Sequence, residues 1–183
     1  MTPQPPEASQ DIVEDTFCDD MIALIPSLRA FARGLCRNRD LADDLVQEAM
    51  MRGWAAQKTF TPGTNLRAWM FTILRNHFYG LARKKKRETE LDPEVAEQTL
   101  VQKATQEDGL NLDDVDRAMA RLPAHQAEIL WLIAGAGLSY EEAANVVGCT
   151  MGTVKSRLNR ARAAVREIIE DPGRVELTPR HVA

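Results

Sequence analysis

Hydrophobic residues recur at steps of three and four along most of this chain, and that spacing predicts amphipathic helices. One helical stretch runs from Phe17 to Arg87, and a second runs from about Leu112 to Ile169. No stretch alternates apolar and polar residues at a period of two with β-branched enrichment, which is the pattern typical of strands. The sequence therefore predicts an all-α fold. In the first stretch the recurring apolar positions are Leu24, Leu28, Phe31, Leu35, Leu41, Leu45, Ala49 and Met50.

A Pro-Gly turn interrupts the first helical stretch. Residues 60–65 have the sequence Phe-Thr-Pro-Gly-Thr-Asn, and Pro followed by Gly marks a turn. Thr64 or Asn65 can cap the helix that follows, because either side chain can accept a hydrogen bond from a free backbone N–H group. We expect that helix to run from Leu66 to about Arg83.

The second helical stretch contains a short helix, a glycine turn and a longer helix. Ser139 and Glu142 have the spacing of a capping box, so a short helix is expected to begin there. Gly148 can adopt the left-handed conformation of a helix-ending turn. Thr150 can cap a last helix that ends near Ile169. This order of elements is typical of a helix-turn-helix.

The composition divides the chain into two small helical domains joined by a flexible acidic linker. Residues 88–110 are rich in acids, contain a Pro and a Gly, and show no apolar period, as expected of a linker. We therefore expect one domain at residues 17–87 and the helix-turn-helix domain at residues 111–170. Residues 1–16 are expected to be a disordered tail, because Pro, Gln and acids dominate there, and residues 171–183 form a second tail.

Charge is strongly segregated along the chain, although the formal net charge is only −4. Residues 61–87 hold seven basic residues and no acid, and residues 143–166 hold five basic residues and no acid. Residues 88–116 between them hold ten acids and one base. A basic island binds phosphates by releasing condensed counterions, so each domain is expected to contact nucleic acid. The alternative for each island is a solvated helix face.

The last helix has one apolar face, and the opposite face has the composition of a DNA-reading surface. Asn and Arg can pair with base edges in the major groove, and neighbouring basic residues can bind phosphates. Small residues on the same face would admit the helix to the groove. A helical hairpin with a solvated face is the alternative interpretation. The expected DNA contacts are Thr150, Thr153, Lys155, Ser156, Asn159, Arg160 and Arg162.

No motif for catalysis, cofactor binding or metal binding occurs in the sequence. His77, His125 and His181 are far apart, and there is no Gly-rich phosphate loop or nucleophile elbow. The three cysteines form no Cys-x-x-Cys pair, so reduced thiols are expected. The first twenty residues contain six acids and no Lys or Arg, unlike a signal peptide. We expect a cytoplasmic protein that has no membrane segment, metal, cofactor or small-molecule substrate.

Over about residues 17–169 the chain resembles the sigma-70 family of RNA polymerase sigma factors. Residues 138–162, centred on Gly-Thr-Val-Lys-Ser-Arg, resemble the domain that reads the −35 promoter element. Residues 43–49 resemble the stretch that holds the polymerase clamp helices, and residues 68–76 resemble the segment that opens and reads the −10 element. The order and short length are similar to the extracytoplasmic-function group. Residues 60–65 and the helix after them most resemble its general stress response (EcfG-like) branch.

The resemblance implies a non-enzymatic sigma factor with a region 2-like domain followed by a region 4-like domain. Such a protein directs core RNA polymerase to specific, stress-response promoters and initiates DNA opening at the −10 element. The implied partners are the polymerase core, through its β′ clamp helices and β flap, and promoter DNA. An anti-sigma factor is also implied, and we expect it to be a small soluble protein.

The resemblance also assigns roles to residues of the first domain. The polymerase contact falls on Asp44, Gln47 and Glu48, whose charges alone would indicate only favourable interaction with a helix dipole. The loop is expected to pocket a flipped base, and extrusion of that base costs a few kcal/mol. Trp69 and Phe71 are expected to be core residues. The −10 contacts fall on Phe60, Gly63, Thr64, Asn65, Arg67, Arg75 and Asn76.

Two other protein classes share part of this sequence pattern. A sigma-like decoy that sequesters an anti-sigma factor would keep both domains but would need no DNA-reading face. Such decoys are usually attached to a receiver domain, and no alternating strand and helix pattern of that kind is present. A helix-turn-helix repressor would leave the acidic helix and the loop at residues 60–65 unexplained. The basic last helix therefore favours the sigma factor over the decoy, and the acidic helix and the loop favour it over the repressor.

Overall fold

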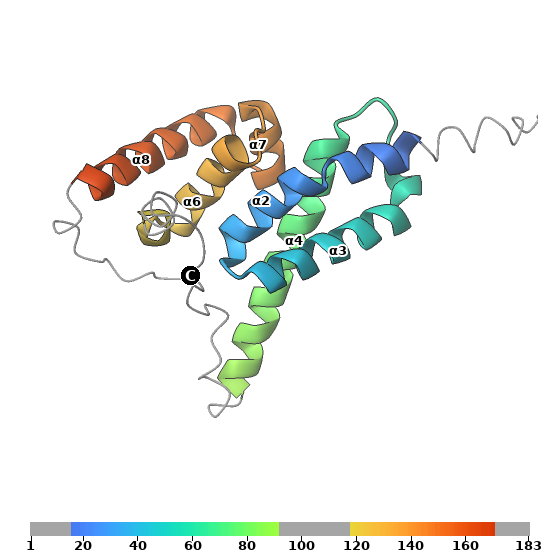
Figure 1. Ribbon diagram of the computed structural model, residues 1–183, viewed down its shortest axis with the longest axis horizontal. Coiled ribbons are helices and arrows are strands. Elements are labelled where there is room, and N and C mark those ends of the chain that lie inside the picture. Colours follow the sequence, from blue (N-terminus) through green and yellow to red (C-terminus); the bar gives the residue numbers. More distant parts are fainter. Residues whose placement is uncertain (1–15, 92–117, 171–183) are drawn as a thin grey trace, which may run out of the picture.

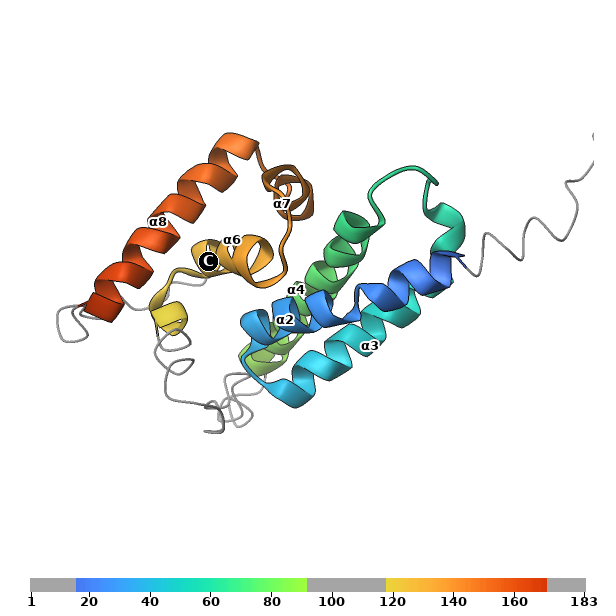
Figure 2. The same ribbon diagram turned by 45° about the horizontal axis from the view of Figure 1, so that its top comes forward.

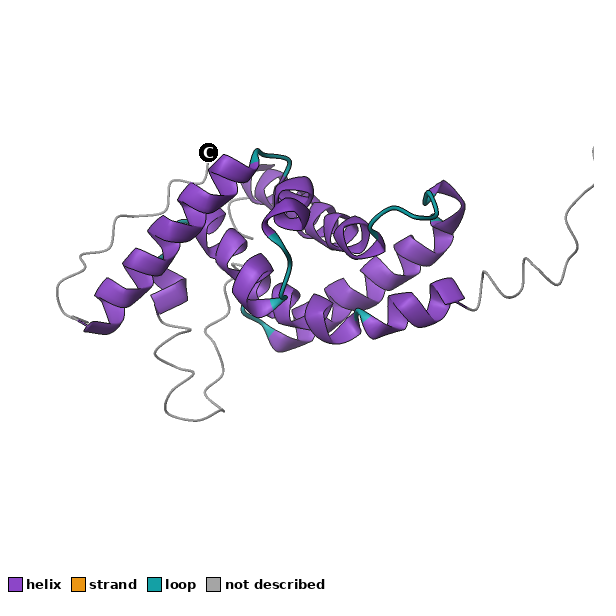
Figure 3. Cartoon of the chain, turned by 90° about the horizontal axis from the view of Figure 1, so that it is seen from above, coloured by secondary structure: helices purple, strands orange, loops and turns teal. Residues whose placement is uncertain are grey.

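The computed structural model describes residues 16–91 and 118–170, and all regular structure in these two ranges is helical (Figures 1 and 3). The predicted all-α fold is therefore confirmed for the described part of the chain. The first range contains helical residues 16–23, α2 (Ile25–Cys36), α3 (Arg39–Ala55), the short 3-10 helix η1 (Gln57–Thr59) and α4 (Leu66–Leu91). The second contains helical residues 118–121, α6 (Ala124–Leu130), the π-helical turn η3 (Trp131–Gly135), α7 (Tyr140–Val147) and α8 (Met151–Glu170).

Helix α4 is longer than the apolar period of the sequence predicts. It begins at Leu66, as expected, but continues past Arg83 and Arg87 to Leu91. Lys, Arg and Glu are good helix formers, so the polar residues after Arg83 extend the helix without needing an apolar face. The tails expected at residues 1–16 and 171–183 lie outside the described residues, except for residue 16.

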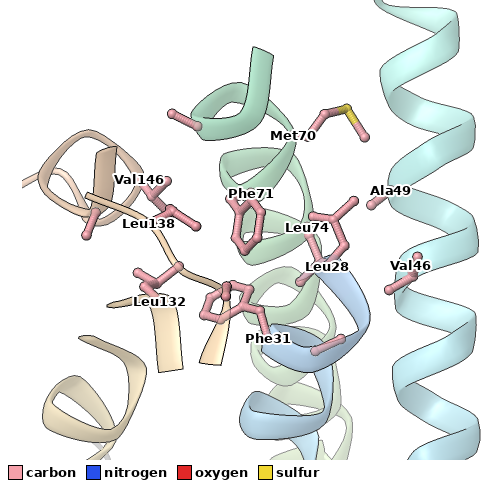
Figure 4. Packing of buried hydrophobic residues seen from close by; sticks show 14 of the residues in the cluster. Leu28, Phe31, Val46, Ala49, Met70, Phe71, Leu74, Leu132, Leu138 and Val146 are labelled. Carbon is pink, nitrogen blue, oxygen red and sulfur yellow. The ribbon is translucent and has the colours of Figure 1, made fainter. Parts of the chain in front are cut away.

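Side chains from both halves of the chain form one hydrophobic core (Figure 4). The rings of Phe31 on α2 and Phe71 on α4 lie 5.4 Å apart, and both are fully buried. Leu132 and Leu138 from the second half of the chain lie beside these two rings (Figure 4). Burial of one such large side chain contributes roughly 1.5–3 kcal/mol, so contact between the two halves is a substantial part of the stability of this arrangement.

A smaller core belongs to the second half alone. Met119, Leu122 and Ala161 are buried together, with Ala127 and Val165 packed against them. This cluster packs α8 against α6, and Figure 2 shows the course of the two helices. Helix α7 packs against both α8 and α4, so it lies between the last helix and the first domain (Figure 1).

Candidate nucleic-acid interface

The helix-turn-helix of α7 and α8 has the local structure that its sequence predicts. The hydroxyl oxygen of Ser139 accepts from the N–H of Glu142 at 3.2 Å, and the Glu142 carboxylate accepts from the N–H of Ser139 at 2.6 Å. Gly148 ends α7 with a φ of 73°, in the left-handed region. Thr150 then caps α8, because its Oγ1 accepts from the N–H of Thr153 at 3.2 Å. The predicted capping box, turn and second cap are all confirmed.

Helix α8 buries one face and exposes the other. Val154, Leu158 and Ala161 are buried, so the apolar face predicted from the sequence is confirmed. The hydroxyl of Ser156 donates to the carbonyl of Thr153 at 3.0 Å, which turns it toward its own helix. On the opposite face Lys155, Asn159, Arg160 and Arg162 are exposed, and Thr150 is exposed at its start.

The exposed face of α8 keeps its positive charge available to a partner. Among the residues that the structure describes, no ion pair engages Arg160 or Arg162. The ammonium of Lys155 lies 6.0 Å from the centre of the Tyr140 ring, which places that charge over the N-terminus of α7. Basic side chains that carry no internal counter-ion are suited to contact phosphates, and Asn159 lies among them for a base edge.

The loop before α4 presents short polar groups above an aromatic cluster. Phe60 is half-buried, and its ring lies 5.3 Å from Trp69 and 5.7 Å from Phe17. Gly63 has a φ of 84° and, like Thr64, is exposed. Trp69 is partly buried and packs against the core, as expected, and it also lies against the loop. Phe60 anchors the loop through its contacts with Trp69 and Phe17.

Asn65 begins helix α4 as the sequence predicts and also reaches the second domain. Its Oδ1 accepts from the N–H of Ala68 at 2.9 Å, which caps the helix. Its Nδ2 donates to Oε1 of Glu142 at 3.0 Å. Burial opposes ionisation of Glu142, but the hydrogen bonds from Asn65 and Ser139 outweigh it and lower the pKa of that carboxyl.

Arg67 and Arg75 face the second domain rather than open solvent. Arg67 donates from Nη2 to the backbone carbonyl of Ala136. Arg75 donates from Nε to Oε1 of Glu128 at 2.7 Å, and only 3% of the Glu128 side chain is exposed. Removal of one partner from such a buried ion pair typically costs about 3–5 kcal/mol. The following residue, Asn76, is exposed.

Three residues at the contact between the two domains, Glu128, Tyr79 and Trp131, were not expected from the sequence. Glu128 is a buried acid on α6, and its position directly before the apolar run at residues 129–134 was the available signal. Tyr79 lies below the Arg75 guanidinium, 4.9 Å from ring centre to Cζ. Burial, together with the nearby Glu128 carboxylate, raises the pKa of Tyr79 to about 12. Trp131 lies against Gly34, where a Cβ atom would be 2.3 Å from the indole ring.

Helix α3 carries the acidic surface that the sequence assigned to a protein partner. Asp44 and Gln47 are exposed, and Glu48 forms an ion pair with Arg52 at 2.6 Å. The hydrogen bond from Arg52 lowers the pKa of Glu48. These three residues line an open groove between α3 and α4, with His77 on its other side. Exposed Met51 and Leu81 add apolar surface to the same groove.

Among the described residues, no group of three or more His, Cys, Asp or Glu side chains could hold a metal ion. Within the same residues, no helix has both the length and the apolar character needed to cross a membrane. The protein surfaces that stand out are therefore the basic face of α8, the loop with the start of α4, and the acidic groove on α3.

Known protein families and known sequences match both halves of the chain. The profile of sigma-70 region 2 matches residues 22–88, and that of sigma-70 region 4 matches residues 112–165. The chain is 44% identical to the ECF RNA polymerase sigma factor EcfG of Rhodopseudomonas palustris, covering 90% of this chain and 91% of that protein. It is 33% identical to the ECF sigma factor SigC of Mycobacterium tuberculosis, covering 68% of each chain.

A solved structure has the same fold. The sigma factor RpoE of Bartonella quintana, in complex with the anti-sigma factor NepR, matches with a TM-score of 0.73 and 42% identity. The match covers 85% of this chain and 97% of the other.

Proposed function

This chain belongs to the extracytoplasmic-function group of sigma-70 RNA polymerase sigma factors, and we propose that it serves the general stress response. As a sigma factor it directs core RNA polymerase to specific promoters. The observation that carries the proposal is the capped helix α8, which has no acid from Met151 to Arg166 and exposes Lys155, Asn159, Arg160 and Arg162 on one face. The stress branch is supported by the 44% identity to EcfG.

Recognition of the −35 element is assigned to the second domain, which we place at residues 111–170. Asn159 and Arg160 lie on the outer face of α8, where an inserted recognition helix contacts base edges. Thr150, Thr153, Lys155, Ser156 and Arg162 surround them and would contact phosphates or the groove wall. The hydroxyl of Thr153 already bonds to that of Thr150, and the hydroxyl of Ser156 donates to the carbonyl of Thr153, so these two would contribute mainly small size.

Opening at the −10 element is assigned to the first domain, which we place at residues 17–87. Extruding a base costs a few kcal/mol, and a pocket must offset that cost. The exposed loop at Gly63 and Thr64, held on Phe60, offers polar groups for a base edge. Asn65, which caps α4, and Arg67, Arg75 and Asn76 on α4 would hold the backbone of the unpaired strand.

The acidic groove on α3 is assigned to the polymerase. Asp44 and Gln47 are exposed and Glu48 borders the groove, so their side chains are available to the β′ clamp helices. The second domain would contact the β flap. Two separate docking surfaces on one polymerase agree with the two domains and with a linker between them, expected at residues 88–110, of which residues 88–91 instead extend α4.

An anti-sigma factor is the proposed regulator. The Bartonella quintana structure holds its sigma factor together with NepR, and this chain would bind a small soluble protein of the same kind. The proposed setting is the cytoplasm. The protein is proposed to act without catalysis of its own, since the arrangement of its surfaces serves binding.

Run-off transcription with purified core polymerase and a panel of stress promoters tests the proposal. We expect promoter-specific transcripts with the protein and none without it. The variant with Asp44, Gln47 and Glu48 changed to Ala should lose them, whereas Glu167→Ala, an exposed acid on α8, should not. Absence of transcripts combined with tight binding of an anti-sigma factor would identify the chain as a decoy instead.

A further inference from the structure

The residues proposed to hold the unpaired −10 strand already have partners in the second domain. Arg75 is paired with buried Glu128 at 2.7 Å, and the side chain of Arg75 is only 22% exposed. Arg67 is bonded to the carbonyl of Ala136. Asn65 donates to Glu142 at 3.0 Å. Each contact joins α4, or the residue before it, to the second domain: Glu128 lies on α6, Glu142 lies on α7, and Ala136 lies between these two helices.

Apolar side chains also pack across the contact between the two domains. Gly34 of α2 lies so close to the Trp131 indole that no Cβ atom fits between them. Phe71 of α4 is fully buried beside Leu132 and Leu138 of the second domain (Figure 4). The closed arrangement is therefore a packed interface, in which the guanidinium groups of Arg67 and Arg75 are bonded to the second domain.

We propose that the second domain is an intramolecular inhibitor of promoter opening, which masks Asn65, Arg67 and Arg75 until the two domains separate. The inference rests on the proposed role of these residues at the −10 element. A strand that binds only the open form shifts the protein toward that form, and its apparent affinity is the intrinsic affinity multiplied by the fraction of open molecules. The second domain and the unpaired strand thus compete for the same three side chains.

The closed arrangement covers the proposed strand-binding residues but not the other two proposed binding surfaces. Lys155, Asn159 and Arg160 on α8 stay exposed in the closed arrangement, and so do Asp44 and Gln47 on α3. The closed protein therefore keeps its proposed −35 and polymerase surfaces while its strand-binding surface is covered. Engagement of polymerase and the −35 element can precede release of the −10 surface, so that opening is confined to promoters that hold both domains apart.

Two features of the contact between the domains favour its separation. Nε of Arg67 is buried without a hydrogen-bond partner, and an unsatisfied buried donor destabilises the state that contains it. The hydrogen bond between Asn65 and Glu142 is at the exposed edge of the interface. Separation of the domains would hydrate Arg67 fully and would leave Glu142 in its capping box with Ser139.

A single substitution can open the interface without touching the strand-binding residues. Gly34→Ala places a methyl group where the Cβ position is 2.3 Å from the Trp131 ring. The same change favours α2 itself, because Ala has a higher helix propensity than Gly. Gly80→Ala is the matched control, since a Cβ atom at that position of α4 meets nothing within 4 Å. Glu128→Gln is a second variant, which removes the charge that Arg75 pairs with.

Small-angle X-ray scattering of the full-length proteins measures opening, and run-off transcription at limiting protein measures its consequence. We expect Gly34→Ala and Glu128→Gln to have a larger radius of gyration than wild type and Gly80→Ala, with unchanged helical circular dichroism. Both variants should give several-fold more transcript than Gly80→Ala at limiting protein.

Two results would overturn the inference. One is scattering from Gly34→Ala and Glu128→Gln that matches the wild type, which would show that these contacts do not hold the domains together. The other is an open variant whose transcript yield equals that of Gly80→Ala. If no protein in the series gives transcripts, the proposed function fails and the inhibitory role falls with it, while scattering still shows whether Gly34 and Glu128 close the molecule.

Discussion

The Nδ2 amide of Asn65 lies 3.0 Å from Oε1 of Glu142, and this one hydrogen bond joins the start of α4 to the capping box of α7. The two residues are 77 positions apart. The other carboxylate oxygen of Glu142 accepts from the backbone N–H of Ser139. A single side chain therefore begins the helix-turn-helix and also touches the loop proposed to bind the −10 element.

The outer face of α8 gives a prediction about DNA affinity. Arg160→Ala should weaken holoenzyme binding to promoters with an intact −35 element by about 1–3 kcal/mol, because the proposed bidentate contact to a base would be lost. Lys155→Ala should instead weaken binding to all sequences and lower the salt slope by about one. Gel-shift titrations of holoenzyme at several salt concentrations measure both effects.

Arg33→Ala is the control for the loss of positive charge, since Arg33 is exposed on α2, away from α8. It should leave both promoter preference and salt slope unchanged. Equal losses in Arg33→Ala and Arg160→Ala would show that net charge, and not the recognition face, sets the affinity.

The turn between α7 and α8 gives a prediction about stability. Gly148 has a φ of 73°, and a Cβ atom there would meet no neighbour. Gly148→Ala should therefore destabilise the protein by about 1 kcal/mol through backbone strain alone. Gly148→Asn should cost less, because Asn tolerates the left-handed region. Urea denaturation measures both, and an Ala variant as stable as wild type would contradict the account of the turn.

His77, in the groove between α3 and α4, should make stability depend on pH. Burial, and next the charge of Arg52, lower its pKa from the ordinary 6.5. A His with a lowered folded pKa binds protons more readily when unfolded, so the folded state loses stability as pH falls from about 6.5 toward the lowered value. Relative to His77→Gln, the wild type should become less stable across that window. Urea denaturation of both proteins measures the difference in unfolding free energy at about pH 7.5 and at about pH 5. A difference that is the same at both pH values would contradict this prediction.

Much of the fold could be predicted because its signals are local. Asn65, Thr150 and the pair Ser139 and Glu142 cap helices within a few residues of their own position, and Gly148 takes the only conformation that its turn allows. The buried faces of the helices follow from apolar spacing, which depends on the helical repeat alone.

The contact between the domains could not be predicted from the same signals. Arg75 and Glu128 are 53 positions apart, and helical periodicity says nothing about which distant side chains meet. From charge alone, Arg67 and Arg75 belong to a basic island, yet both have partners in the second domain. The π-helical turn at Trp131–Gly135 changes the helical repeat where Trp131 meets Gly34, and no local pattern announces such a turn.

Permanganate reactivity of promoter thymines tests the central claim most directly. With core polymerase, this protein and a stress promoter, thymines of the −10 element should become reactive, because they are unpaired. Thr64 is exposed, and its hydroxyl donates to the carbonyl of Thr61 within the same turn. Replacing Thr64 by Leu, while Gly63 keeps its φ of 84°, should abolish that reactivity while the holoenzyme still binds the −35 element. Thymines that stay unreactive with the wild-type protein, on a promoter that the holoenzyme demonstrably occupies, would contradict the assignment of DNA opening to the first domain.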